Sequence, residues 1–522
     1  MTRRSTGKTG KNARLTSAPP RKKKKGKSPE SLDSARFPAQ IYAETVLAVN
    51  FNDARKYFLE ALIEIHYAHT LMLAQQGIIS QSDAGACLRA LDDLDRKAIG
   101  AAIYDGSFED LFFYVEDQLA KCCGAADIAG KMHTARSRND IDLTLYRMCL
   151  RRELLKVADG VLSVRRELTQ LAADNIDTVM PAYTHMQPAQ PTTLAHYLLA
   201  AVEFLGRDSE RLKAAFANVN RSPLGACAIT TTGLPIDREC TARLLGFEGL
   251  QVNSYGAIAA IDYLTESASA AAVAMINLGK LVQDLLLWTT AEYGFLRLSD
   301  GFVQISSIMP QKRNPVSLEH TRILASKALG QAQAILTCAH NTPFGDIVDS
   351  EDDLQPLVFS MFADAERALR LFAGLIANCE INRERLQKRA NSSFLTATEL
   401  ADTLVRREGL TFRLAHRLVS GAVKRVGPEY TPERMIAEVE RLAPEVIGRR
   451  LNTGTAELLR ALDAENFIAV RTIIGGPAPQ AVKPEIERAQ REMEQMRCWL
   501  EQKWELMKRY PELIRSAAAP RT

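Results

Sequence analysis

The chain has 522 residues, of which 46% are hydrophobic and 25% charged, an ordinary composition for a globular protein of about two to four domains. Its net charge of +4 is uneven, because residues 1–27 hold eleven Lys or Arg and no acid, which leaves 4 − 11 = −7 for the rest. That negative balance argues against nucleic-acid binding by the folded part.

Nine scattered cysteines include no CxxC pair and no Cys/His cluster with zinc spacing. This pattern predicts reduced thiols in a cytoplasmic protein and no structural metal. No uncharged apolar stretch of about 18 residues occurs, so we expect no membrane span.

Residues 1–35 are predicted to form a disordered basic tail, because Lys, Ser, Gly and Pro cannot bury apolar surface. The tail lacks the apolar core of a secretory signal. A solubilising extension and a segment that attracts nucleic acid or anionic lipid both stay open.

From Phe37 onward the apolar residues recur with helical spacing, which predicts an all-α protein. The predicted helices cover residues 53–77, 80–98, 108–122, 141–176, 191–219, 257–291, 316–340 and 356–378. The last five are long and predict an elongated bundle, in which the Ala-rich face of 257–291 allows close helix contacts, within the bundle or between subunits.

The predicted domains follow from these changes in helix length. They are an N-terminal helical domain over 36–136, a central long-helix bundle over 137–384, and a small C-terminal helical domain over 385–522. The long polar segment 221–252 interrupts the bundle, and such loops are usually functional.

Three polar stretches stand at the ends of the long helices. The first contains Arg136, Ser137, Arg138 and Asn139, whose fork-shaped guanidinium groups and neutral donors suit carboxylate binding. Asn139 or Asp140 could instead cap the helix that follows.

The second and third stretches carry candidates for acid–base chemistry. His185 lies in a polar turn, where a histidine can transfer protons. Ser306, Lys312 and Asn314 together could remove a proton and hold an oxyanion, although SSxxxxK alone is also common in surface turns.

The three stretches read RSRND (136–140), YTHMQPAQPTT (183–193) and SSIMPQKRNP (306–315). In this order they resemble the fumarase/aspartase superfamily and, within it, argininosuccinate lyase, over roughly residues 40–470. The resemblance implies a three-domain helical fold with five long helices per subunit. It also implies a homotetramer with a twenty-helix core, active sites shared among subunits, and no cofactor.

The reaction implied by the resemblance is the elimination of fumarate from an N-substituted aspartate, an amino-dicarboxylate. Ser306 would remove the proton, and Lys312 with Asn314 would stabilise the resulting aci-carboxylate. His185, oriented by Glu319, would protonate the leaving amine. The remaining implied substrate-binding residues are Arg136, Ser137, Arg138, Asn139, Thr184, Gln187, Arg238, Ser307 and Met309.

The amine side departs from the argininosuccinate lyase pattern. Ile305 stands where that family has Gly, Ile141 where it has Gln, and Phe112 where it has His. The two family residues that bind the arginine part align with Phe51 and Arg55 and leave Asp53 nearby, and residues 345–353 are rich in acids. A buried acidic set would favour a cationic amine, whereas a solvated acidic turn before the helix 356–378 is the alternative.

These departures resemble a branch that includes ethylenediamine-disuccinate lyase. The predicted substrate is therefore an amino-disuccinate or another N-substituted aspartate. A true argininosuccinate lyase, and a crystallin-like structural protein that reuses the scaffold, are the alternatives.

Overall fold

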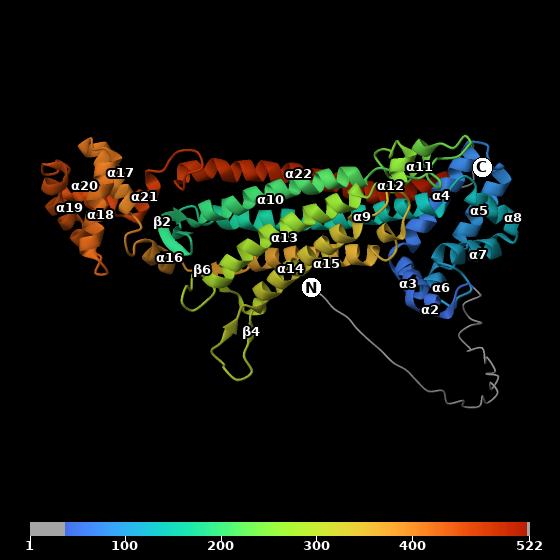
Figure 1. The fold of residues 1–522 in the computed structure, drawn as a ribbon, viewed down its shortest axis with the longest axis horizontal. Coiled ribbons are helices and arrows are strands. Elements are labelled where there is room, and N and C mark those ends of the chain that lie inside the picture. The colour runs from blue at the N-terminus through green and yellow to red at the C-terminus, as the bar shows by residue number, and fades with distance from the viewer. Residues whose placement is uncertain (1–36, 519–522) are drawn as a thin grey trace, which may run out of the picture.

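The computed structural model describes residues 37–518, so the predicted basic tail lies outside the described residues. Helices dominate this part of the chain, and the predicted all-α class is confirmed (Figure 1). A long bundle separates an N-terminal helical region at one end of the molecule from a small helical domain at the other.

The N-terminal region consists of short helices packed around α4. Its elements are α2 (Gln40–Tyr42), a π-helix (Ala43–Leu47), α3 (Ala48–Tyr57), α4 (Leu59–Gln75), α5 (Gln81–Asp92), α6 (Arg96–Ala101), α7 (Leu111–Cys123), α8 (Ala126–Gly130) and a 3-10 helix (Lys131–His133). The predicted helix 53–77 divides at Phe58, and the predicted helix 80–98 divides after Asp92. Ser80 caps α5 as expected, since its hydroxyl accepts a hydrogen bond from the Asp83 amide at 3.1 Å.

The bundle contains the five predicted long helices. They are α9 (Arg138–Ala173), α10 (Leu194–Val219), α13 (Asp262–Trp288), α14 (Val316–Ala339) and α15 (Gln355–Ala377). α9 packs against both α10 and α15, and α14 packs against both α13 and α15. By length and composition alone α13 could cross a membrane, but its buried side chains belong to the bundle core, so this is weak evidence for a span.

A sixth long helix, α22 (Pro479–Ala518), lies along α9 and α10 (Figure 1). The indole N–H of Trp504 in α22 donates a hydrogen bond to Asp159 of α9 at 2.6 Å. Glu492 of α22 forms an ion pair with Arg165 of α9 at 2.9 Å. The predicted C-terminal domain 385–522 thus includes a segment whose buried side chains join the bundle core.

The small domain has a separate core. It is built from α17 (Ala397–Glu408), α18 (Phe412–Val426), α19 (Pro432–Ile447) and α20 (Thr455–Ala461), with α16 (Arg383–Ala390) and α21 (Ala464–Ala469) leading to and from it. It lies at the end of the bundle opposite the N-terminal region (Figure 1).

Short strands and single turns complete the described chain. The strands form three antiparallel pairs: β1 (Val179–Thr184) with β2 (Gln187–Thr193), β3 (Leu296–Leu298) with β6 (Cys379–Ile381), and β4 (Gln304–Ile305) with β5 (Arg313–Asn314). The polar segment 221–252 holds α11 (Arg238–Leu244) and is followed by α12 (Ser254–Ala259), while 3-10 turns occupy Asp300–Phe302 and Val348–Ser350.

We expect Gly160→Ala to destabilise the bundle. A Cβ at Gly160 in α9 would lie 2.9 Å from the Cβ of Leu369 in α15, so the two helices would have to separate. Such overpacking exceeds the gain in helix propensity, giving a net loss of about 1–2 kcal/mol. Urea unfolding measures the loss. Gly100→Ala, in α6 with no atom within 4 Å of the added Cβ, is the control and should not lower stability.

Candidate functional site

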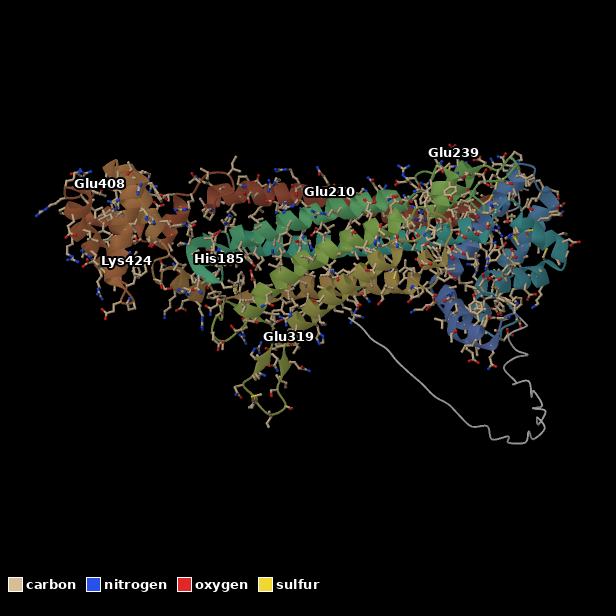
Figure 2. All side chains as sticks on the ribbon, in the orientation of Figure 1. His185, Glu210, Glu239, Glu319, Glu408 and Lys424 are labelled. Atoms are coloured by element: carbon tan, nitrogen blue, oxygen red, sulfur yellow. The ribbon has the colours of Figure 1, made fainter. Side chains whose placement is uncertain are left out.

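The three polar stretches, at residues 136–140, 183–193 and 306–315, do not come together within a single chain. The carboxylate-binding stretch begins α9, and His185 lies beyond the other end of the same helix, which is 36 residues or about 54 Å long (Figure 2). The β4–β5 hairpin with Ser306 projects from the bundle near the start of α14 (Figure 1). A complete site of the predicted kind therefore needs residues from more than one copy of the chain.

The first stretch forms the N-terminus of α9. Ser137 is the N-cap residue, and Asp140 three residues on completes a capping box, since its carboxylate accepts a hydrogen bond from the Ser137 amide at 2.9 Å. The same carboxylate accepts bonds from the amides of Gly225 and Cys227 at 2.7 and 2.9 Å, which fastens the polar loop to the helix start. Asn139 adds a bond to the Ala228 carbonyl at 3.1 Å.

Arg138 lies on the outer side of this helix start, half-exposed. Its guanidinium pairs with Asp110 at 2.5 Å and with Glu109 at 3.2 Å. Burial opposes its charge, but the hydrogen bond to Asp110 and the two carboxylates outweigh it and raise the pKa of Arg138. Arg138 is thus a permanent cation in this part of the site.

Two other predicted substrate-binding arginines make internal contacts in the single chain. Arg136 is buried beneath Phe112, donates to His66 at 2.8 Å, and leaves two guanidinium nitrogens without a partner. Burial lowers the pKa of Arg136 to about 10. Arg238 donates to the backbone carbonyls of Pro223, Leu224, Gln251 and Val252, and so holds the polar loop together.

His185 lies at the tip of the β1–β2 hairpin. His185 and Met186 both have positive φ, 49° and 62°, the backbone of a two-residue hairpin turn that usually needs Gly or Asn. Non-glycine residues held there often mark a functional turn. The turn presents His185 and Thr184 to solvent, and Gln187 follows on the return strand.

The predicted base lies in the loop between β4 and β5. The Ser306 hydroxyl oxygen accepts hydrogen bonds from the Met309 and Ile308 amides at 3.0 and 3.3 Å. Lys312 and Ser307 are exposed, and Asn314 pairs with Gln304 at the base of the hairpin. Ile305 and Ile308 are 75% and 83% exposed, so the hairpin offers apolar surface that this chain leaves uncovered.

Glu319 lies in the first turn of α14, apart from His185 (Figure 2). Neither side chain has a hydrogen bond or an ion pair within residues 37–518. A contact between them, as the resemblance implies, would also need a second chain.

The acidic segment 345–353 folds back onto the start of α9. Here Asp352, Asp142 and Asp110 line a cavity of about 40 Å³ together with aromatic and aliphatic side chains. Tyr146 donates a hydrogen bond to Asp352 at 2.9 Å. Sequence reasoning identified the acids of 345–353 but missed Asp142, although its position four residues after Arg138 places both on one helix face.

Crowding of acids shifts their titration. Burial, followed by the carboxylates of Asp352 and Asp110, raises the pKa of Asp142 well above its usual value. Burial and the neighbouring Asp346 raise the pKa of Glu351 to about 8, and burial also raises the pKa of Asp352. Burial and mutual repulsion thus favour the protonated forms of these acids, whereas a cation beside them, as Arg138 is, favours the ionised forms.

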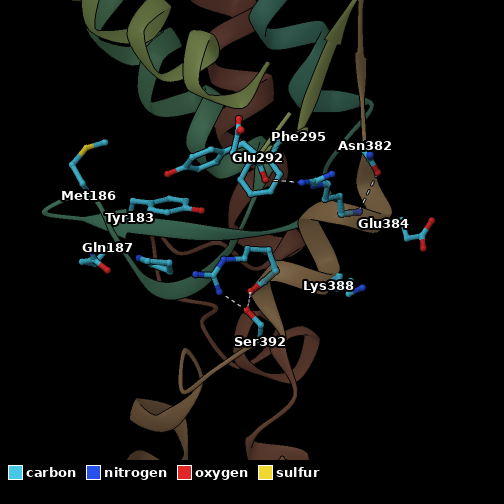
Figure 3. Close-up of a pocket in the computed structure, with 13 residues that line it drawn as sticks. Tyr183, Met186, Gln187, Glu292, Phe295, Asn382, Glu384, Lys388 and Ser392 are labelled. Carbon is cyan, nitrogen blue, oxygen red and sulfur yellow. Dashed lines mark hydrogen bonds between the residues drawn. The ribbon is translucent and has the colours of Figure 1, made fainter. Parts of the chain in front are cut away.

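A larger cavity of about 870 Å³ lies below the β1–β2 hairpin (Figure 3). Tyr183, Met186 and Gln187 form one wall, and Lys388 with Arg389 of α16 form another. Gln187 is the single predicted site residue that lines it. The cavity is therefore adjacent to the hairpin that carries His185 and separate from the other two stretches.

Comparison with known proteins identifies the class. Residues 50–330 match a lyase family model, and residues 394–469 match the argininosuccinate lyase C-terminal model. Argininosuccinate lyase 2 of Agrobacterium fabrum is 41% identical over 463 residues, 87% of this chain and 91% of that protein. Argininosuccinate lyase of Methanococcoides burtonii is 38% identical over 84% of this chain and 89% of that protein.

Solved structures agree with these relatives. An EDDS lyase in complex with formate superposes with a TM-score of 0.81 at 32% identity, covering 94% of this chain and 95% of that one. A class II fumarase from Schistosoma mansoni shares the fold, with a TM-score of 0.64 at 17% identity over 83% of this chain and 94% of its own. The chain belongs to the fumarase/aspartase superfamily as an argininosuccinate lyase-like member. It is a carbon–nitrogen lyase, as the resemblance predicted.

The raised pKa of Glu351 predicts a pH-dependent stability. The unfolded chain titrates Glu351 near 4.5 and the folded chain near 8, so the folded state binds the extra proton between these values. Stability that is present below pH 4.5 is thus progressively lost as the pH rises to about 8. Glu351→Gln, which stays neutral, should show a smaller fall in thermal unfolding midpoint between about pH 5 and pH 9.

Asp349→Asn serves as the control for that experiment, because Asp349 is an exposed acid of the same segment. It should keep the wild-type slope. An equal slope in Glu351→Gln and wild type would contradict the assignment.

Proposed function

We propose that this lyase eliminates fumarate from an N-substituted aspartate, with Ser306 as the base and an aci-carboxylate as the intermediate. The observation that carries the proposal is the set of three polar stretches, each presented at an end or on a projecting hairpin of the bundle. They supply a carboxylate-binding arginine, a serine with an adjacent lysine, and a histidine, which are the groups that this elimination requires.

The surroundings of Ser306 support a role as an alkoxide. Its oxygen already accepts two backbone N–H bonds, from Ile308 and Met309, and such bonds favour the charged form of an oxygen acid. The exposed Lys312 ammonium has no ion-pair partner within the described chain and is free to meet negative charge. Loss of the proton next to a carboxylate gives a doubly negative intermediate, which Lys312 and Asn314 would stabilise.

His185 completes the proposed reaction as the acid that protonates the leaving amine, directly or through water. Arg138, Ser137 and Asn139 would bind the succinyl carboxylates, with Thr184, Gln187, Ser307 and Met309 contributed by the two hairpins. Glu319 would orient His185 from another subunit. The proposed assembly is a homotetramer in which each site draws on several chains, and the exposed Ile305 and Ile308 support such burial between copies.

Two substrates stand out among the N-substituted aspartates. Similarity to proteins named argininosuccinate lyase supports argininosuccinate as the substrate of this chain. Similarity to structures named EDDS lyase supports ethylenediamine-disuccinate, an amino-disuccinate. The alternative to an enzyme is an inactive, crystallin-like structural protein. The presence of Ser306, Lys312 and His185 together argues against that alternative.

Ser306→Ala should lower fumarate formation by about 10²–10⁴-fold while the fold and assembly stay intact, because it removes only the base. Fumarate absorbance with argininosuccinate and ethylenediamine-disuccinate as substrates measures the loss. Ser326→Ala, an exposed serine on α14, is the matched control. Near-normal turnover by Ser306→Ala would eliminate Ser306 as the base.

Mixing two inactive variants tests the shared site. Ser306→Ala and His185→Asn should each be inactive alone. After joint refolding of equal amounts, about a quarter of the sites should combine an intact Ser306 and an intact His185 from different chains. Activity near that fraction is expected, and complete absence of activity in verified mixed tetramers would show that both groups come from one chain.

A further inference from the structure

The cavity beside the start of α9 has a divided lining. Its apolar wall is formed by Phe58, Leu62, Leu111, Phe112 and Leu145, and its acidic wall by Asp110, Asp142 and Asp352. The volume of about 40 Å³ exceeds what one water molecule requires and suits a small polar head group with an adjoining methylene.

The acidic wall is short of positive charge. Asp110 is already paired with Arg138 and caps α7 through the Phe113 amide at 3.0 Å. Asp352 accepts one bond, from the Tyr146 hydroxyl. Asp142 lines the cavity with no hydrogen-bond or ion-pair partner anywhere in residues 37–518. An enclosed carboxylate without a partner is costly, and a cation entering the cavity would supply the missing one.

Further acids surround this wall. Glu351 and Asp346 interact with each other next to Asp352, and Asp353 and Asp53 lie close enough to affect each other's charge. Lys56 is the cation near Asp53, and it is exposed. The cluster as a whole would therefore attract a cation and repel a carboxylate.

The cavity adjoins the proposed succinyl-binding stretch. Asp142 follows Arg138 by one helical turn, so their Cβ atoms are about 6 Å apart on the same face of α9. A substrate whose succinyl carboxylate met Arg138 would direct its amine substituent along this face toward Asp142 and Asp352.

We propose that the amine released by this enzyme carries a second cationic group, an ammonium or a guanidinium, which binds in the Asp142–Asp352 cavity. The substituent bears no carboxylate at that end, so a simple diamine is preferred to argininosuccinate and to ethylenediamine-disuccinate, whose leaving amines both carry distal carboxylates. The inference rests on the proposed function, since it concerns the other half of the same substrate. A metal ion is not the proposed occupant, because within residues 37–518 no three His, Cys, Asp or Glu side chains, these three Asp included, are arranged so that they could hold one.

The addition direction gives a matched test. The free amine attacks one alkene carbon of fumarate, so a C–N bond forms as the C=C π bond breaks; the neighbouring carbon takes a proton and the nitrogen loses one. The probes are 1,4-diaminobutane, butylamine and 4-aminobutanoate, which share a chain length and differ in distal charge. A shorter set, 1,2-diaminoethane, ethylamine and glycine, tests the case in which the cavity lies closer to the reacting nitrogen. Loss of fumarate absorbance measures each rate.

1,4-Diaminobutane should react at least about tenfold faster than butylamine, which has no distal charge, when the concentrations of free base are matched. 4-Aminobutanoate, with its distal carboxylate, should be slowest. Asp142→Asn and Asp352→Asn should each reduce the preference for the diamine over butylamine toward one. Asp349→Asn, an exposed acid outside the cavity, should keep the preference. A misfolded Asp142 variant would leave Asp352→Asn as the deciding measurement.

The outcomes separate the two claims. Equal rates for diamine and butylamine, or faster turnover of argininosuccinate than of every diamine adduct, would overturn the inference and leave the lyase reaction in place. Absence of any Ser306-dependent reaction, with amines or with N-substituted aspartates, would instead overturn the proposed function, and the inference with it.

Discussion

The unbroken length of α9 is the constraint on which the rest of the site depends. This helix starts with the stretch that contains Arg138 and ends before the strand that leads to His185, so its full length of about 54 Å lies between the two stretches in any one chain. No loop motion can bring such points together while the helix stays intact. A site that used both Arg138 and His185, as proposed, would therefore have to combine different copies of the chain.

The electrostatic design follows from the same helix. Its first turn carries a capping acid, Asp140, that organises the polar loop through Gly225 and Cys227, and a cation, Arg138, that is held by Asp110. One turn further on, Asp142 has no such partner. Arg138 and Asp142 thus place a cation and an acid one turn apart on one helix face, which would suit a substrate with carboxylates at one end and a cation at the other.

Features that depend on local sequence patterns, such as helices and their caps, could be predicted from the sequence. Apolar spacing gave the five long helices to within a few residues, and Ser80 was recognisable as a cap. The hairpin at His185 was not predicted, because its turn uses His and Met at positive φ where pattern rules require Gly or Asn. The position of α22 was missed as well, since it has interior prolines and a highly charged outer face.

The candidate site was predictable in its residues and not in its arrangement. The RSRND stretch, the His185 turn and the Ser306 loop are recognisable by composition. Only the structure shows that Arg136 and Arg238 bind groups of their own chain, His66 and backbone carbonyls, while Arg138 stays half-exposed. Such assignments depend on which side chains neighbouring helices cover, and that information is tertiary. Asp142 is the exception: it was missed, although its helical spacing from Arg138 would have been sufficient to find it.

The two halves of the proposed substrate meet different kinds of structure. The groups proposed to break the bond, Ser306 and His185, lie on two separate hairpins, and their relative geometry in the proposed site would depend on assembly. The acidic cavity is enclosed by α3, α4, α7, α9 and the segment before α15 of one chain. Under the two proposals, a substitution in this cavity would change which amine binds and leave the proposed base on the β4–β5 hairpin in place. Amine specificity and bond cleavage would then be separable, with the charge of the cavity wall determining the leaving group.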